Sequence, residues 1–190
     1  MTALEEYINS FFGIIDPDEL AVIADLFKKS SIRKGDYLVE SGKICGQLSF
    51  VETGLLRMFE MTKDKEITQW ISAQGYFSAD LSSFLFETPS RLSIQAIEDT
   101  EVYSISKKDY LIIGELVPNW HALEKTFILR CFIMLEQRIW THLSMTAEER
   151  YHAFFENNKA LFNKVPLQYI ASMLGMTPET FSRIRKKQFQ

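Results

Sequence analysis

The sequence predicts an α+β protein in which helices precede and follow a region of short β-strands. Between Ile32 and Ile105, strand-type segments alternate with glycine-containing turns, a pattern typical of a β-sandwich, barrel or roll. No helical pattern long enough for a βαβ crossover interrupts them. After residue 105 the apolar residues recur at helical spacing instead. The turn glycines are Gly35, Gly42, Gly46, Gly54 and Gly75.

Two short helices are expected before the strands. Apolar residues recur at helical spacing from Leu4 to Phe12, and Asp16 is suited to cap a second helix with Pro17 at its first position. The strands are expected at residues 37–39, 48–51, 55–61, 66–71, 93–96 and 102–105. A further helix is predicted from Ser106 to Leu116.

The longest helical pattern runs from Pro118 to about Leu143 and is apolar nearly all round. Such a helix is buried on more than one side. It either packs on the strands with one face and on a second copy with the other, or lies at the centre of a monomer. Two stripes carry the apolar residues: Trp120, Leu123, Phe127, Met134 and Trp140, and Ile128, Cys131, Phe132 and Leu135.

Charge is distributed unevenly along the chain. Residues 159–190 carry a net charge of +5, whereas the rest carries −9. An acidic body with a basic end is typical of a protein that holds phosphate at that end, although a solvated basic terminus gives the same pattern. Another helix is predicted from about residue 146 to Phe155, before this basic segment.

Residues 167–186 have the spacing of two helices packed at a steep angle. The small side chain of Ala171 allows the helices to approach closely, and Gly175 falls in the turn, where positive φ is needed. Thr177 is suited to cap the second helix, and Pro178 to occupy its first turn. The alternative is an ordinary αα-hairpin with a basic end.

The second helix, at about 178–188, is expected to expose a polar and basic face. As a recognition helix, it places Arg183 to read guanine and Glu179 to accept from cytosine, while Arg185, Lys186 and Lys187 hold phosphates. The candidate DNA-binding residues are Thr177, Glu179, Thr180, Ser182, Arg183, Arg185, Lys186 and Lys187.

The whole chain resembles the Crp/Fnr family of bacterial regulators. The resemblance is carried by IASMLGMTPETFSRIRKK, RKGDYLVESGK and FVETGLLRMF. It implies a jelly-roll-like, double-stranded β-roll of the cyclic-nucleotide-binding type at residues 1–116, a dimerisation helix at 117–144 and a helix-turn-helix domain at 145–190. The residues assigned to the dimer helix are Leu123, Phe127, Cys131 and Met134.

The sequence departs from the family pattern in two places. Where the family holds a cyclic nucleotide, Asp80 and Ser90 stand in place of a Glu and of the phosphate-binding Arg, and Arg91 is one residue late. Cyclic AMP is therefore not the expected effector. The wing that follows the recognition helix is also expected to be missing, since three residues remain after Lys187. The candidate effector-pocket residues are Phe77, Asp80, Leu81, Ser90 and Arg91.

These observations predict a cytoplasmic, sequence-specific DNA-binding transcription regulator. The alternative is a small-ligand or cyclic-nucleotide sensor module with degenerate DNA binding. The sequence has no nucleophile–base pair, metal-ligand spacing or phosphate loop, so neither an enzyme nor a cofactor is expected. Neither a signal peptide nor a membrane span is expected. The expected partners are double-stranded DNA, a second copy of the chain, an unidentified small-molecule effector and RNA polymerase.

Overall fold

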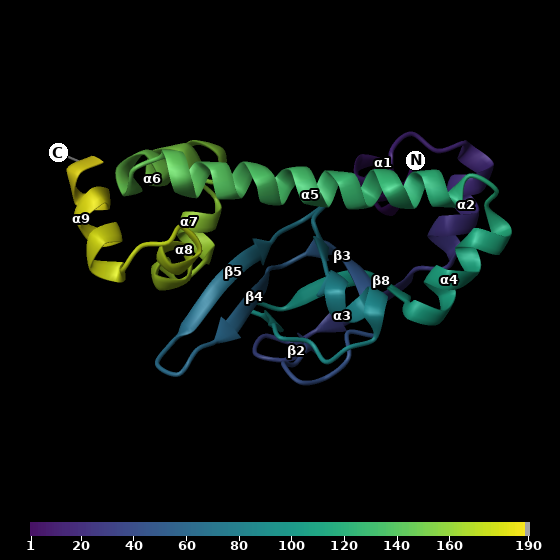
Figure 1. The fold of residues 1–190 in the computed structure, drawn as a ribbon, viewed down its shortest axis with the longest axis horizontal. Helices are drawn as coiled ribbons and strands as arrows, with labels where there is room; N and C mark the ends of the chain where they lie inside the picture. Colours follow the sequence, from purple (N-terminus) through teal and green to yellow (C-terminus); the bar gives the residue numbers. More distant parts are fainter. Residues whose placement is uncertain (189–190) are drawn as a thin grey trace.

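The computed structural model describes residues 1–188, with a long helix lying along a β-roll and a cluster of short helices at its far end (Figure 1). The prediction of a missing wing concerns the chain after residue 188 and lies outside the described residues. The helices are α1 (Ala3–Phe12), α2 (Pro17–Asp25), α3 (Leu81–Phe86), α4 (Lys107–Leu116), α5 (Trp120–Ser144), α6 (Ala147–Asn157), α7 (Leu161–Lys164), α8 (Leu167–Met173) and α9 (Pro178–Gln188).

Within residues 1–188, the strands form two four-stranded antiparallel sheets, ordered β1-β8-β3-β6 and β2-β7-β4-β5. The predicted α+β class and the roll with flanking helices are therefore confirmed. The strands are β1 (Lys28–Ile32), β2 (Tyr37–Val39), β3 (Gln47–Thr53), β4 (Leu56–Met61), β5 (Glu66–Ser72), β6 (Phe77–Ser78), β7 (Ser93–Ala96) and β8 (Thr100–Ser106).

Four elements were not expected from the sequence: β1, β6, α3 and α7. β1 reads KKSSI and is mostly exposed, so it has no apolar alternation to reveal it, and it is held by antiparallel pairing with β8. β6 is only two residues long, and α3 and α7 are each shorter than two helical turns. Segments this short present too few apolar residues to establish a period.

One face of α5 closes the core of the roll together with α1. The ring of Phe127 stacks on Phe12 with centroids 4.6 Å apart, and Phe12 also stacks on Trp120 at 5.2 Å. Arg130 adds a hydrogen bond to the Ser10 carbonyl oxygen of α1. Burying several aromatic side chains together is worth several kcal/mol, at about 2 kcal/mol or more each, so the N-terminal half of α5 is held firmly on the roll.

This packing corrects the residues assigned to the dimer helix. Leu123, Phe127 and Cys131 are buried in the protomer's own core, and Met134 lines a cavity between α5 and the roll. They share one face of the helix, as their spacing indicated, but that face is turned inward. When a helix is apolar on two sides, its sequence does not show which side packs against its own domain. The exposed apolar residues of α5 are Ile128, Leu129, Phe132, Ile133, Leu135, Ile139, Trp140 and Leu143.

No helix among residues 1–188 combines the length and the apolar composition that a bilayer crossing requires.

The tight turn between β3 and β4 provides a test of the roll's packing. Gly54 has φ +90°, and a Cβ there would lie 2.4 Å from Thr100 Oγ1 and 2.6 Å from the Asp99 carbonyl oxygen. We expect Gly54→Ala to lower the free energy of unfolding in urea by more than about 2 kcal/mol, from backbone strain plus the clash. Gly42, at φ +85°, is the matched control, because a Cβ added there would have no atom within 4 Å other than those of its chain neighbours. Gly42→Ala should cost about 1 kcal/mol from strain alone. Equal losses would show that the close approach at Gly54 does not matter.

Candidate functional site

Helices α8 and α9 are joined by a short turn at residues 174–177. Gly175 has φ +69°, and the Met176 N–H donates to the Ala171 carbonyl oxygen at 2.9 Å. Phe181 and Ile184 on the inner face of α9 are buried, and the Phe181 ring meets Tyr151 of α6 with centroids 5.1 Å apart. The inner face of α9 is thus fixed by α6 and α8, and its opposite face is exposed.

Most of the predicted DNA-binding residues lie on this exposed face. The Thr177 hydroxyl caps α9 by accepting from the Thr180 N–H at 3.2 Å. Hydrogen bonds from its own backbone N–H and from Thr177 hold the pKa of the exposed Glu179 below its ordinary value, so the carboxylate stays charged. The exposed members of the set are Thr177, Glu179, Ser182, Arg183, Lys186 and Lys187, while Thr180 and Arg185 are half-buried.

The cations of α9 differ in how they are engaged. Lys187 Nζ lies 3.5 Å from Glu148 Oε2 of α6, and the half-buried Arg185 lies near Tyr151. Within the part of the chain that the structure describes, Arg183 and Lys186 form no ion pair and are exposed. These two side chains are therefore the most available for an anionic partner.

Helix α8 is docked on the hairpin of β4 and β5, a contact that the sequence did not reveal. The guanidinium carbon of Arg57 lies 3.6 Å from the centroid of the Tyr169 ring and 4.3 Å from that of Phe59. Arg57 is fully buried, and it donates to Thr68 Oγ1 at 2.9 Å and to Glu66 Oε2 at 2.5 Å. A buried cation between two rings and hydrogen-bonded on its edge joins the roll to α8 directly.

Two more polar contacts complete this docking. The Thr68 N–H donates to Ser172 Oγ at 2.9 Å. Arg138 of α5 donates to the Gln69 carbonyl oxygen of β5 and to the Met173 carbonyl oxygen of α8, the latter at 2.9 Å. Strand β5, helix α5 and helix α8 therefore meet at Arg138.

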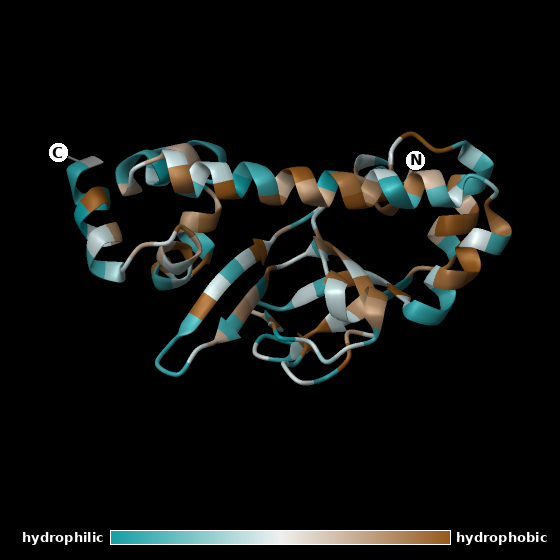
Figure 2. Cartoon of the chain, viewed as in Figure 1, coloured by the Kyte–Doolittle hydropathy of each residue, from teal (hydrophilic) through white to brown (hydrophobic). Residues whose placement is uncertain are grey.

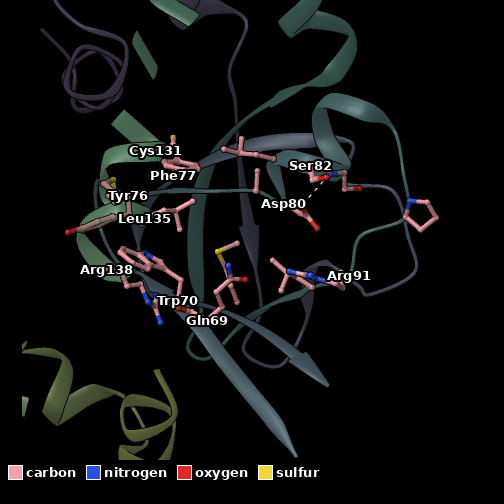
Figure 3. Close-up of a pocket in the computed structure, with 17 residues that line it drawn as sticks. Gln69, Trp70, Tyr76, Phe77, Asp80, Ser82, Arg91, Cys131, Leu135 and Arg138 are labelled. Carbon is pink, nitrogen blue, oxygen red and sulfur yellow. Dashed lines mark hydrogen bonds between the residues drawn. The ribbon is translucent and has the colours of Figure 1, made fainter. Parts of the chain in front are cut away.

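A cavity of about 490 Å³ lies between the roll and α5 (Figure 3). Its wall is largely apolar, with Trp70 and Arg138 at one end and Asp80 and Arg91 at the other. The remaining lining residues are Met58, Gln69, Tyr76, Phe77, Ala79, Leu81, Ser82, Ser83, Pro89, Leu92, Cys131, Met134 and Leu135.

The structure brings four of the five predicted pocket residues to this cavity: Phe77, Asp80, Leu81 and Arg91 line it. Ser90 is buried behind it and donates to Asp80 Oδ2 at 2.8 Å. Asp80 Oδ1 accepts from the Ser83 N–H at 3.2 Å and so caps α3. The Asp80 carboxylate thus occupies the start of α3 itself. Arg91, which is largely exposed, lies 3.3 Å from Glu60 Oε2.

Sequence reasoning missed the opposite end of the cavity, with Trp70, Tyr76 and Arg138. In the sequence, Arg138 follows Glu136 and Gln137 and so looks like one more solvent-facing polar residue of the helix. Nothing in the sequence pairs it with β5. Cys131 also lines the cavity, and burial raises the pKa of its thiol to about 11, so it stays protonated at neutral pH. Among the described residues, no group of His, Cys, Asp and Glu side chains is arranged to hold a metal ion.

Comparison with known proteins agrees with this geometry. Residues 29–113 match the family model of the cyclic nucleotide-binding domain. Among solved structures, FixK2 from Bradyrhizobium japonicum is 18% identical with a TM-score of 0.68, over 85% of this chain and 83% of that one. The catabolite activator protein of Thermus thermophilus is 22% identical with a TM-score of 0.57, over 93% and 85%.

The cAMP-bound PfPKA-R (141-441) is 14% identical with a TM-score of 0.54, over 58% of this chain and 40% of that longer one. No curated protein matches the sequence significantly. These likenesses show a cyclic nucleotide-binding fold in the roll.

The docking of α8 can be tested at a single amide. We expect Tyr169→Leu, which keeps an apolar side chain but removes the stacking on Arg57, to weaken the contact by about 1–2 kcal/mol. The Thr68 N–H, which Ser172 covers, should then exchange with solvent about 5–30 times faster by NMR. Tyr37→Leu, at an exposed tyrosine of β2, is the control and should change nothing there. Unaltered exchange at Thr68 in Tyr169→Leu would contradict the assigned role of the stack.

Proposed function

We propose that this chain is a sequence-specific DNA-binding transcription regulator of the Crp/Fnr type, with α8 and α9 as its helix-turn-helix and no enzymatic activity. The observation that carries the proposal is the row of exposed polar and basic side chains on α9, whose opposite face is buried against α6 and α8. In a recognition helix, Arg183 and Glu179 would read base edges, while Lys186 and neighbouring cations would hold phosphates.

The proposal includes a homodimer formed through the exposed face of α5. Ile128, Phe132, Leu135 and Ile139 follow each other at spacings of four, three and four residues, which is the repeat of a coiled-coil seam. Figure 2 shows hydrophobic segments recurring along α5, and these four side chains are exposed in the protomer. A contiguous apolar stripe that is exposed in the protomer favours packing against the same helix of a second copy. A two-fold pair of α9 helices would match a two-fold operator.

The predicted division of the chain follows from this assignment. Residues 1–116 would form the sensor, 117–144 the dimerisation helix and 145–190 the DNA-binding domain. A regulator of this type works where the chromosome is, so the proposal implies a cytoplasmic protein. RNA polymerase would be a further partner of such a regulator.

The effector is proposed to be something other than cyclic AMP. The carboxylate of Asp80 caps α3, and Ser90 occupies the position at which the Crp/Fnr pattern has its phosphate-binding Arg. A cyclic phosphate at this position would meet the negative charge of Asp80, and Arg91, which lines this end, is largely exposed and lies 3.3 Å from Glu60 Oε2. The cavity itself favours a small-ligand sensor, and such a module with degenerate DNA binding is the second candidate function.

A mobility shift with fragments from the protein's genomic neighbourhood separates these two functions. We expect specific complexes, with Arg183→Ala weakening the preferred site by about 1–3 kcal/mol and relaxing its preference at one base pair. Lys186→Ala should instead weaken all sequences alike and reduce the slope of log K against log salt by about one. Lys63→Ala, in the turn between β4 and β5, is the control on a remote exposed lysine. Absence of any DNA complex would favour the sensor module.

Thermal unfolding with cyclic AMP tests the effector assignment. A ligand at about 100 times its Kd stabilises by about 2.7 kcal/mol, which raises Tm by about 5–10 °C in a protein of this size. We expect no such rise, because Asp80 presents a negative charge, Ser90 supplies no cation, and Arg91 is already paired with Glu60. Cyclic GMP and 5′-AMP serve as parallel controls. A concentration-dependent rise with cyclic AMP alone would overturn the assignment.

A further inference from the structure

Arg138 differs from the other arginines of the chain in its surroundings. It is half-buried on α5, it lines the cavity, and its guanidinium lies over the Trp70 ring with 5.3 Å to the centroid. Its hydrogen-bond partners, the Gln69 and Met173 carbonyl oxygens, are neutral. The other arginine that lines the cavity, Arg91, pairs with Glu60, and the buried Arg57 of β4 pairs with Glu66.

The charge of Arg138 is therefore uncompensated. Within the described residues it forms no ion pair, and burial alone lowers the pKa of its guanidinium, with no contribution from a nearby carboxylate. A guanidinium nevertheless stays protonated in proteins, so a positive charge is held partly out of water at the wall of an open cavity. Backbone carbonyls and an aromatic face offset only part of that cost, and an anion would offset the rest.

The rest of the cavity limits what kind of anion fits. Its lining is mainly apolar and includes Trp70, Phe77 and Leu81. Both carboxylate oxygens of Asp80 are already engaged, by Ser83 and Ser90. A ligand complementary to this wall has one anionic group and a mainly apolar body, since the apolar side chains that form most of the wall offer few partners to further polar groups.

We propose that the cavity binds an apolar carboxylic acid as its carboxylate, with the negative charge on Arg138. This inference rests on the proposed function and names the chemical class of its effector. The apolar body, aliphatic or aromatic, would lie between Trp70, Phe77 and Leu81. The same side chain that binds the ligand also holds the end of α8, so Arg138 connects the cavity to the candidate DNA-binding helices.

The direction of that connection follows from hydrogen-bond strength. A carboxylate accepts about twice as strongly from a guanidinium as a neutral carbonyl does, and it prefers two parallel bonds. An acid that takes two parallel bonds from Nη1 and Nη2 of Arg138 engages the two nitrogens that donate to the Gln69 and Met173 carbonyl oxygens, and so competes with the carbonyl that ends α8. Occupancy of the cavity therefore loosens the docking of α8 on β5, where Thr68 and Ser172 share a hydrogen bond.

Calorimetry on the DNA-free full chain, with charged and neutral ligands of equal shape, tests the proposal. The probes are octanoate against 1-octanol for an aliphatic body, and 2-naphthoate against 2-naphthalenemethanol for an aromatic one. We expect the unaltered chain to bind at least one acid about tenfold or more tightly than its alcohol, which is about 1.4 kcal/mol. Binding of neither acid, or equal binding of acid and alcohol, would overturn the proposal.

Variants assign the charge recognition to one arginine. Arg138→Gln should bind the alcohol as before but lose the preference for the acid, whereas Arg91→Gln should keep that preference. A preference retained in Arg138→Gln, or lost in Arg91→Gln, would contradict the assignment. If Arg138→Gln does not fold, Arg138→Lys replaces it, and it should keep a preference for the acid that is weaker because the two parallel bonds are lost.

Hydrogen exchange gives a second readout. The acid should speed exchange at Thr68 and in α8 of the unaltered chain, and its alcohol should not. Exchange that stays unchanged or slows would contradict the coupling. Since neither measurement uses DNA, failure of the chain to bind DNA would overturn the proposed function and leave this test intact.

Discussion

The structure depends on one contact: the inward face of α5 packed against the roll and α1 around Phe127. Because this helix is 25 residues long, fixing its first half also fixes the direction of its second half, which extends beside β5. The cavity, the position of Arg138 and the docking of α8 all follow from that direction. Loss of this packing would leave the cavity without one wall and α8 without one of its three polar contacts.

The sequence predicted much of this fold because the relevant signals were local. The apolar periods of the long helix, the glycine turns of the roll and the cap at Thr177 each lie within a few residues of one another. The roles of Arg57 and Arg138 could not be found in this way. Each acts between segments far apart in the chain, and a single cation in a helix or strand has no periodicity that would reveal its partners. The face of α5 that turns inward was also undetermined, since both faces are apolar.

The start of α3 and the end of α8 show two ways of satisfying a helix terminus. At α3 the chain supplies its own anion, because Asp80 caps the helix and is held in turn by Ser90. At α8 a cation from another element reaches a terminal carbonyl oxygen. The first arrangement places a negative charge beside Arg91 at one end of the cavity, and the second places a positive charge at the other end.

Leu135 belongs to both the cavity lining and the exposed apolar stripe of α5. In an isolated protomer this part of the cavity wall faces water. Where two α5 helices pair, the same side chain is covered and the wall is completed. Self-association and ligand affinity are then thermodynamically linked, so that each strengthens the other by the same factor. The apparent affinity for the ligand would be weaker at nanomolar than at micromolar concentrations of the protein. Measuring it over a dilution series would therefore yield the dimerisation constant.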